Sequence, residues 1–223
     1  MSPKPVNDLV VTDSSWLRYP NCPKGIGDVI RTPDSADLIS GVRVYPAPLH
    51  PDDRGYFMEV FRSNTGLGAN FPAESTQVSM AMNYPGIIKA FHFHRHQTDL
   101  WAPSAGMFQV ALVDLRSDSP TFGKRNTFYV GGLRPWHLLI PPGVGHGYKV
   151  VSQEPAVLVY VTDKFYNPAD EGRIEDPNED EESNVSFSKR KQLNDIFKHT
   201  SRRYGTLPIS AIPAKIPIRK KHS

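Results

Sequence analysis

Hydrophobic and polar residues alternate in short runs along the middle of the chain. Alternation with period two, as at Val42 and Val44 or at Phe57, Glu59 and Phe61, is typical of strands with one buried face. The run AVLVYV at 156–161 is apolar throughout, as expected for a strand buried on both faces. The runs taken as strands are SGVRVYPA, RGYFMEVFR, STQVSMAM, GIIKAFHFH, MFQVALVDLR, RNTFYVGG, WHLLIPPG, YKVVS and AVLVYVTDKFY. Their regular spacing predicts an antiparallel sandwich or barrel.

Changes in composition divide the chain into three parts. Residues 1–37 are rich in Pro, Asp and Ser and predict an irregular arm, in which Leu9–Val11 fits one short strand. Residues 38–175 carry the strand pattern, with turn residues such as Pro141-Pro142-Gly143 between the runs. Residues 176–223 predict an acidic linker, a short amphipathic helix from about 188 to 202 and an extended basic tail.

Composition narrows the class of protein. The 26 basic and 23 acidic residues nearly balance, which argues against a nucleic-acid-binding protein. The single cysteine, Cys22, excludes an intrachain disulfide and favours a reducing compartment. No apolar run approaches the roughly 20 residues that cross a bilayer, and the first residues lack a signal-peptide pattern. We therefore expect a cytoplasmic protein with no membrane partner.

The segment 86–106, GIIKAFHFHRHQTDLWAPSAG, holds the most unusual chemistry. It places His92, His94 and His96 within five residues and Asp99 three residues later. On a strand the three imidazoles share one face, since successive side chains point to opposite faces. A row of imidazoles predicts either the lining of a cavity or a metal site.

The spacing of these residues resembles the first sequence motif of the cupin superfamily, with Asp99 where Glu is usual. The segment from Pro141 to His146 resembles the second motif. The resemblance implies a jelly-roll barrel in which His92, His94, Asp99 and His146 hold a divalent Fe, Mn, Ni or Zn ion, and imidazole and carboxylate suit these metals. The alternative has no metal: His92 and His146 act as a base and a hydrogen-bonding group, and His96 faces outward.

Six segments of the core form a second pattern. In chain order they are DRGYFME (53–59), QVSMA (77–81), IKAFHF (88–93), VDLRSDSPTFGK (113–124), LIPPGVGHGY (139–148) and YVTDKFYNP (160–168). Together they resemble the dTDP-4-dehydrorhamnose 3,5-epimerase family, whose members are cupin-fold proteins. The resemblance covers about residues 40 to 175.

This resemblance implies an acid–base reaction on a nucleotide-linked 4-keto-6-deoxyhexose, without a cofactor. His92 would be the base, Tyr160 the acid on the opposite face of the sugar ring, and Lys89 a group that stabilises the enolate oxygen or binds a phosphate. The positions matched to contacts with the nucleotide or diphosphate are Arg54, Glu59, Gln77, His146 and Tyr166. The resemblance further implies a homodimer and a role in surface-polysaccharide or O-antigen synthesis.

The chain departs from the family pattern around its catalytic histidine. Asp99 stands where the family has a lysine, so a cation is replaced by an anion, and Lys89 stands where it has an arginine. The carboxylate that orients the histidine in the family has no clear match, so we leave the partner of His92 unassigned. Asp99 is therefore expected either to contact substrate or to bind a metal.

Three functions follow from these patterns. The first is a nucleotide-sugar 3,5- or 3-epimerase. The second is a metal-dependent cupin enzyme that uses His92, His94, Asp99 and His146. The third is a non-catalytic protein that binds sugar nucleotides.

Overall fold

The computed structural model describes residues 15–18, 20 and 27–173, and the regular secondary structure of this part of the chain consists of strands and one short 3-10 turn. The predicted strand at 9–11 and the predicted helix at 188–202 lie outside the described residues. No helix in the described part is long and apolar enough to cross a membrane. The elements are β1 (Asp28–Val29), β2 (Arg43–Pro46), β3 (Leu49–Asp52), β4 (Gly55–Met58), the 3-10 turn η1 (Gly66–Gly68), β5 (Gln77–Asn83), β6 (Ile88–His94), β7 (Asp99–Ala105), β8 (Met107–Asp114), β9 (Arg125–Gly131), β10 (Trp136–Ile140), β11 (Val144–Val150), β12 (Ala156–Thr162) and β13 (Glu171–Arg173).

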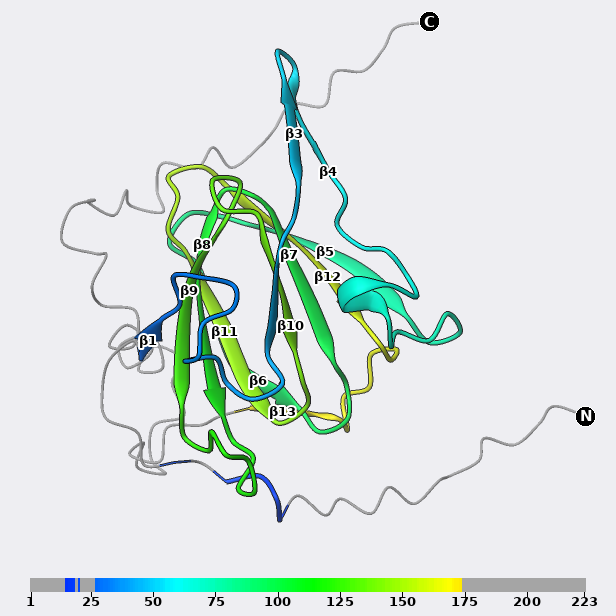
Figure 1. Cartoon of the computed structure of the whole chain (residues 1–223), viewed down its shortest axis with the longest axis vertical. Helices are drawn as coiled ribbons and strands as arrows, with labels where there is room; N and C mark the ends of the chain where they lie inside the picture. Colours follow the sequence, from blue (N-terminus) through cyan, green and yellow to red (C-terminus); the bar gives the residue numbers. More distant parts are fainter. Residues whose placement is uncertain (1–14, 19, 21–26, 174–223) are drawn as a thin grey trace, which may run out of the picture.

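Two sheets form the body of the molecule (Figure 1). A six-stranded sheet has the order β1-β9-β8-β11-β6-β13, and a five-stranded sheet has the order β2-β10-β7-β12-β5. The paired strands are antiparallel, except that β1 runs parallel to β9. The hairpin β3–β4 forms a separate two-stranded sheet and projects beyond the body. The structure therefore confirms the predicted all-β jelly-roll barrel.

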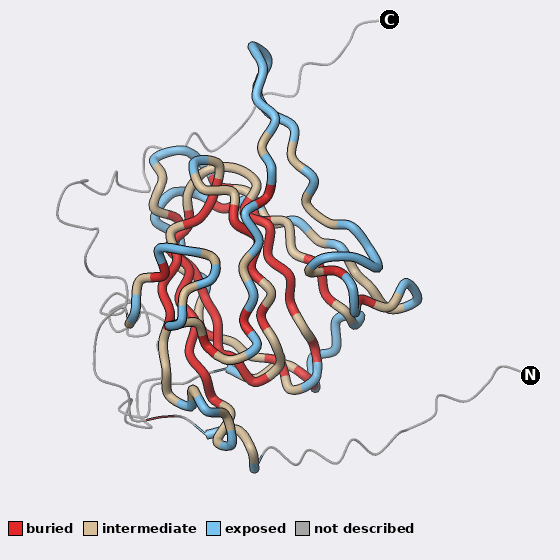
Figure 2. Tube along the Cα trace, viewed as in Figure 1, coloured by how far each residue is buried: buried red, intermediate tan, exposed pale blue. Residues whose placement is uncertain are grey.

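The main hydrophobic core lies between the two sheets, where buried residues gather (Figure 2). Alternate side chains of β8, namely Phe108, Val110 and Leu112, point into it together with Leu138 and Phe128 from neighbouring strands. Fully burying one side chain of this size stabilises the fold by about 1.5–3 kcal/mol. The period-two pattern along these strands thus identifies the inward face.

A second hydrophobic cluster covers the outer face of the five-stranded sheet. Phe71, from the segment after β4, packs there with Leu100, Ala102 and Val161. The inward residues of β12 meet the main core on the other side. The strand at 156–161 is therefore covered on both faces, as its apolar run predicted.

The central strand β7 was not among the predicted strands. Its sequence, DLWAPSA, begins with a carboxylate and contains Pro103, which lacks the N–H that a central strand donates. The pairing of β7 with β12 shifts register between Val157 and Leu158, and Leu158 lies opposite Pro103. This irregularity accommodates the proline in the middle of the sheet.

The turn after β8 is built around a buried carboxylate. Asp114 accepts hydrogen bonds from the side chains of Arg116, Ser119 and Thr121. Arg116 also donates to the backbone oxygen of Ser40 at 2.7 Å, which connects the turn to the segment before β2. The segment 113–124 therefore organises the fold around the end of β8.

Candidate active site

Three histidines meet inside the barrel. His92 and His94 come from β6, and His146 lies directly opposite His92 on β11. Residues directly opposite in an antiparallel pair share a face, and the rings of His92 and His146 lie 4.2 Å apart between centroids. The centroid of His94 is 5.7 Å from that of His146. His96 lies beyond the end of β6 and is exposed, so it does not share the face predicted for all three imidazoles of this segment.

A carboxylate from the other sheet completes the cluster. Asp99, the first residue of β7, is buried, and its Oδ2 lies 3.5 Å from Nε2 of His146. Its Oδ1 lies 3.9 Å from Nε2 of His94. One ligand atom from each of His92, His94, Asp99 and His146 lies within 4.8 Å of the others. The structure thus brings together the four residues proposed from the cupin-like spacing.

Neighbouring groups hold the carboxylate and the His146 ring in place. Gln97 Nε2 donates to Oδ1 of Asp99 at 2.7 Å, and Trp101 Nε1 donates to Oδ2 at 3.2 Å. Nδ1 of His146 lies 2.9 Å from the backbone oxygen of Val144. A carbonyl oxygen only accepts, so Nδ1 carries the proton and Nε2 turns a lone pair toward Asp99.

A second carboxylate, Asp170, lies behind His94. It accepts hydrogen bonds from the backbone N–H groups of Arg95, His96 and Gln97. Its Oδ2 lies 3.9 Å from Nδ1 of His94. Asp170 could not be predicted from the sequence, because more than 70 residues separate it from this segment and no local pattern connects the two.

Burial favours the neutral forms of the His92 and His146 imidazoles. Burial, together with the His146 ring beside it, lowers the pKa of His92 to about 2, against the opposing effect of the Asp99 carboxylate. Burial also lowers the pKa of His146 to about 3. Both rings therefore have a free nitrogen lone pair that accepts a proton or a metal ion.

Tyr160 projects into the same interior from the opposite wall. It lies on β12 of the five-stranded sheet and packs against the main core, whereas His92 belongs to the six-stranded sheet. Nearby, the hydroxyl of Tyr148 donates to Oδ1 of Asn83 at 3.0 Å, and burial raises the pKa of Tyr148 to about 12. His92 and Tyr160 are thus placed on two sides of one interior.

Two cationic residues lie on the inward side of the six-stranded sheet. Lys89 is exposed and pairs with Tyr148 across β6 and β11, which puts the two side chains on one face. Arg173 of β13 pairs with His92 and is also exposed. Arg173 could not be predicted from the sequence, since it lies on a three-residue strand without an alternating pattern.

The remaining predicted contacts lie in different places. Gln77 accepts a hydrogen bond from the backbone N–H of Tyr166, whose side chain is exposed. Arg54 is exposed in the turn of the projecting hairpin and pairs with Asp52. The structure does not bring Arg54 to the histidine cluster of the same chain.

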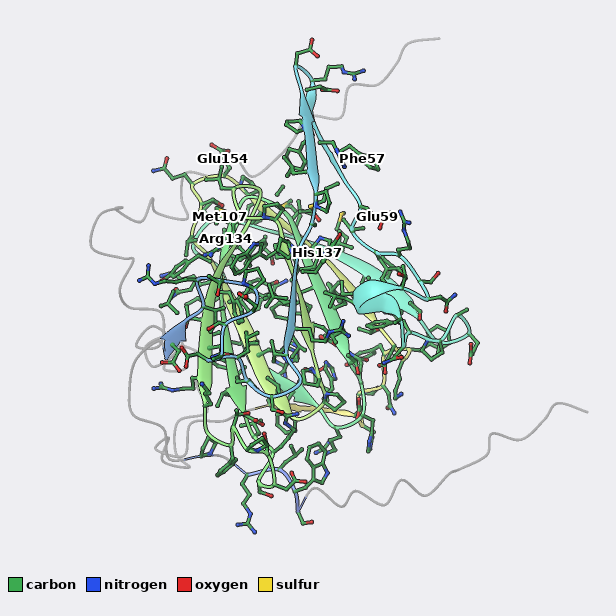
Figure 3. The ribbon with its side chains drawn as sticks, viewed as in Figure 1. Phe57, Glu59, Met107, Arg134, His137 and Glu154 are labelled. Carbon is green, nitrogen blue, oxygen red and sulfur yellow. The ribbon has the colours of Figure 1, made fainter. Side chains whose placement is uncertain are left out.

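Glu59 lies on the outer face of the five-stranded sheet, near His137 (Figure 3). It forms an ion pair with Arg62, with 2.5 Å between the charged atoms. These three residues, with Tyr45 and Leu67, help to line a pocket of about 560 Å³. Glu59 is therefore separated from His92 by the sheet.

Comparison with known proteins agrees with this architecture. The sequence model of the dTDP-4-dehydrorhamnose 3,5-epimerase family matches residues 37–201. The spore coat polysaccharide biosynthesis protein SpsL of Bacillus subtilis is 45% identical over 139 residues, which are 61% of this chain and 89% of that protein. The probable low-salt glycan biosynthesis epimerase Agl13 of Haloferax volcanii is 34% identical over 139 residues, covering 61% of this chain and 87% of that protein.

Solved structures show the same fold. ChmJ, a 3'-monoepimerase from Streptomyces bikiniensis in complex with dTDP-quinovose, superposes with a TM-score of 0.55 at 26% identity, over 61% of this chain and 71% of that one. A double mutant of ChmJ, in which one histidine and one tyrosine are replaced, was solved with dTDP. The chain therefore belongs to the dTDP-4-dehydrorhamnose 3,5-epimerase family of sugar-nucleotide epimerases.

Proposed function

We propose that this protein epimerises a nucleoside-diphosphate-linked 4-keto-6-deoxyhexose in the synthesis of a surface polysaccharide, with His92 as the base and Tyr160 as the acid. The observation that carries the proposal is the position of these two side chains, which project from opposite sheets into one interior. Inversion of a carbon atom requires that a proton leave one face of the sugar ring and return to the other. The substituted histidine and tyrosine of ChmJ match these two residue types.

The chemistry follows from the keto group. The carbonyl at C4 acidifies the hydrogens at C3 and C5, and the neutral His92 imidazole accepts one of them. Because burial lowers the pKa of His92, the enolate that this base creates needs strong stabilisation. Lys89 and Arg173 add positive charge on the inward side of the six-stranded sheet, where an enolate oxygen or a diphosphate would gain from it.

The test is hydrogen exchange in D₂O, followed by NMR on several 4-keto-6-deoxy sugar nucleotides. The unmodified protein is expected to introduce deuterium at C3, C5 or both and to invert the same carbon atoms. His92→Asn should lower the exchange rate by about 100- to 10,000-fold, the usual contribution of a general base. Tyr160→Phe should retain exchange through His92 but lose inversion, because the proton can return only to the face that it left.

His96→Ala is the matched control, since His96 is an exposed histidine of the same segment. It should leave exchange and inversion unchanged. No deuterium incorporation with any of these sugars would refute the proposed reaction. Binding of the sugar nucleotide without exchange would instead assign the protein to the non-catalytic class.

We also propose that two copies of the chain associate through the outer face of β5. This strand is at the edge of the five-stranded sheet, and Val78, Met80 and Met82 on its outer face are 58%, 68% and 54% exposed. An edge strand with an exposed apolar face favours pairing with another chain. Light scattering should give about twice the chain mass of 25.0 kDa, and Met80→Glu should reduce it. A parent protein with the mass of one chain would refute this.

A further inference from the structure

We infer that His94, Asp99 and His146 form a binding site for one divalent transition-metal ion beside His92. The inference deepens the proposed function, because it adds a cation to the interior in which the reaction is placed. It rests on the convergence of two imidazoles and one carboxylate from three strands, β6, β7 and β11. Two histidines and one carboxylate are a common donor set for Fe, Mn, Ni and Zn.

The separations fit an ion after a small contraction. Ligand atoms about 2.0–2.2 Å from a metal ion stand about 3.0–3.5 Å apart in tetrahedral or octahedral geometry. The two measured separations from Asp99 are 3.5 Å to Nε2 of His146 and 3.9 Å to Nε2 of His94. The 3.5 Å pair already has this spacing, the 3.9 Å pair needs to shorten by a few tenths of an ångström, and all ligand atoms of the cluster lie within 4.8 Å of one another.

The metal-ligating atoms of His146 and Asp99 face each other, and neither of these two atoms carries a proton that could join them in a hydrogen bond. Nε2 of His146 is buried and has no hydrogen-bond partner among the described residues, and its lone pair points toward Oδ2 of Asp99. The carboxylate of Asp99 lies beside His94 and His146, and it forms no ion pair with a lysine or arginine of the described part of the chain. Two electron-rich atoms held this close in a buried site repel each other, and a bound cation would relieve the repulsion.

The groups that contact His94, Asp99 and His146 from behind have the arrangement found around metal ligands. Nδ1 of His146 donates to a backbone oxygen, which orients the ring and fixes its tautomer. Gln97 and Trp101 hold the two oxygens of Asp99. Within the described part of the chain, Nδ1 of His94 is buried without a hydrogen-bond partner, and Oδ2 of Asp170 lies 3.9 Å from it, on the side where a carboxylate–histidine–metal arrangement has its carboxylate.

His92 lies beside this site and is the least buried of the four residues. We assign it to the open side of the ion, because a catalytic metal site keeps one position for solvent or substrate. A carbonyl oxygen bound in that position would be polarised by the ion while His92 remains free as a base.

The test measures metal binding directly. An untagged chain, stripped with a chelator, is titrated with Zn²⁺ by calorimetry and with Co²⁺ by visible absorption. One ion per chain is expected, with a Co²⁺ spectrum of low coordination number. His94→Ala, Asp99→Asn and His146→Ala should each weaken binding by more than the roughly 10- to 100-fold that loss of an outer hydrogen-bond partner causes. His96→Ala is the matched control and should bind like the parent.

Circular dichroism checks that each variant is folded. If a variant does not fold, His94→Gln is tested in its place. The Co²⁺ spectrum of the unmodified chain tests the site without any substitution. Absence of binding by the parent, or equal binding by the ligand variants, would overturn the inference. If His92→Asn weakened metal binding as much as His94→Ala does, the three-ligand assignment would be overturned. Metal binding without deuterium exchange would refute the proposed reaction alone, and exchange in the stripped, metal-free protein would refute only the catalytic use of the ion.

Discussion

The Asp114→Asn substitution should destabilise the fold through loss of one buried charge. Oδ1 of Asp114 accepts from the backbone N–H of Arg116 at 3.1 Å and from its Nε at 2.8 Å. Oδ2 accepts from Nη2 of Arg116 at 2.9 Å and from the hydroxyls of Ser119 and Thr121 at 2.6 Å each. An asparagine places an NH₂ group against one of these sets of donors, and Arg116 loses its counter-charge.

Removal of one partner of a buried ion pair costs about 3–5 kcal/mol. We expect the lower end, about 3 kcal/mol, because the Arg116 side chain is 18% exposed and the two hydroxyls can rotate to accept. In a domain of 150–250 residues each kcal/mol lowers the melting temperature by about 2–4 °C, so a decrease of about 6–12 °C is expected. Urea unfolding followed by tryptophan fluorescence gives the change in the free energy of unfolding, provided that the denaturant slope is unchanged.

Asp118→Asn is the matched control, since Asp118 is exposed in the same turn. It should change the free energy of unfolding by no more than about 0.5 kcal/mol. If Asp114→Asn lowered the free energy of unfolding by less than about 1 kcal/mol, the reasoning would be refuted.

The pH dependence supplies a second test of the same carboxylate. Burial by itself raises the pKa of Asp114, but the hydrogen bonds from Arg116, Ser119 and Thr121 outweigh it and lower the pKa below its ordinary value. The stabilisation is therefore fully present above the unfolded-state pKa of about 3.9 and is lost as the pH falls through the folded-state pKa. The difference in stability between the parent and Asp114→Asn should shrink below about pH 4. A difference that is constant from pH 7 to pH 3 would contradict this account.

Trp101→Phe should weaken metal binding by about 10- to 100-fold, measured by the same calorimetry, because Asp99 loses the hydrogen bond from Nε1; unchanged binding would contradict the supporting role of Trp101. Asp170→Asn should lower the free energy of unfolding by about 1–3 kcal/mol in urea, since three backbone N–H groups lose a charged acceptor; a change near zero would mean that those N–H groups find other acceptors. Gly143→Ala should lower the melting temperature, because φ is +75° and an added Cβ would lie 2.5 Å from Arg116 and from Trp16; an unchanged melting temperature would show that the turn rearranges freely.

Local patterns in the sequence predicted most of the strands. The alternation around β8 and the apolar run of β12 depend on side chains that are neighbours along the chain, and both strands form where expected. Strand β7 was missed because Pro103 and its polar ends oppose the strand propensity. Its place in the centre of a sheet comes from pairing with β10 and β12, which are distant in sequence.

The candidate site divides in the same way. A shared face for His92 and His94 can be predicted from local sequence, because side-chain direction along a strand is a local property. Motif spacing also indicates His146 and Asp99. The convergence of these four residues, the place of Asp170 behind His94 and the position of Arg54 on a projecting hairpin are known from the fold alone. They depend on strand register, with its shift between His146 and Tyr148, and register is set by packing and backbone hydrogen bonds between distant segments, which no local pattern encodes.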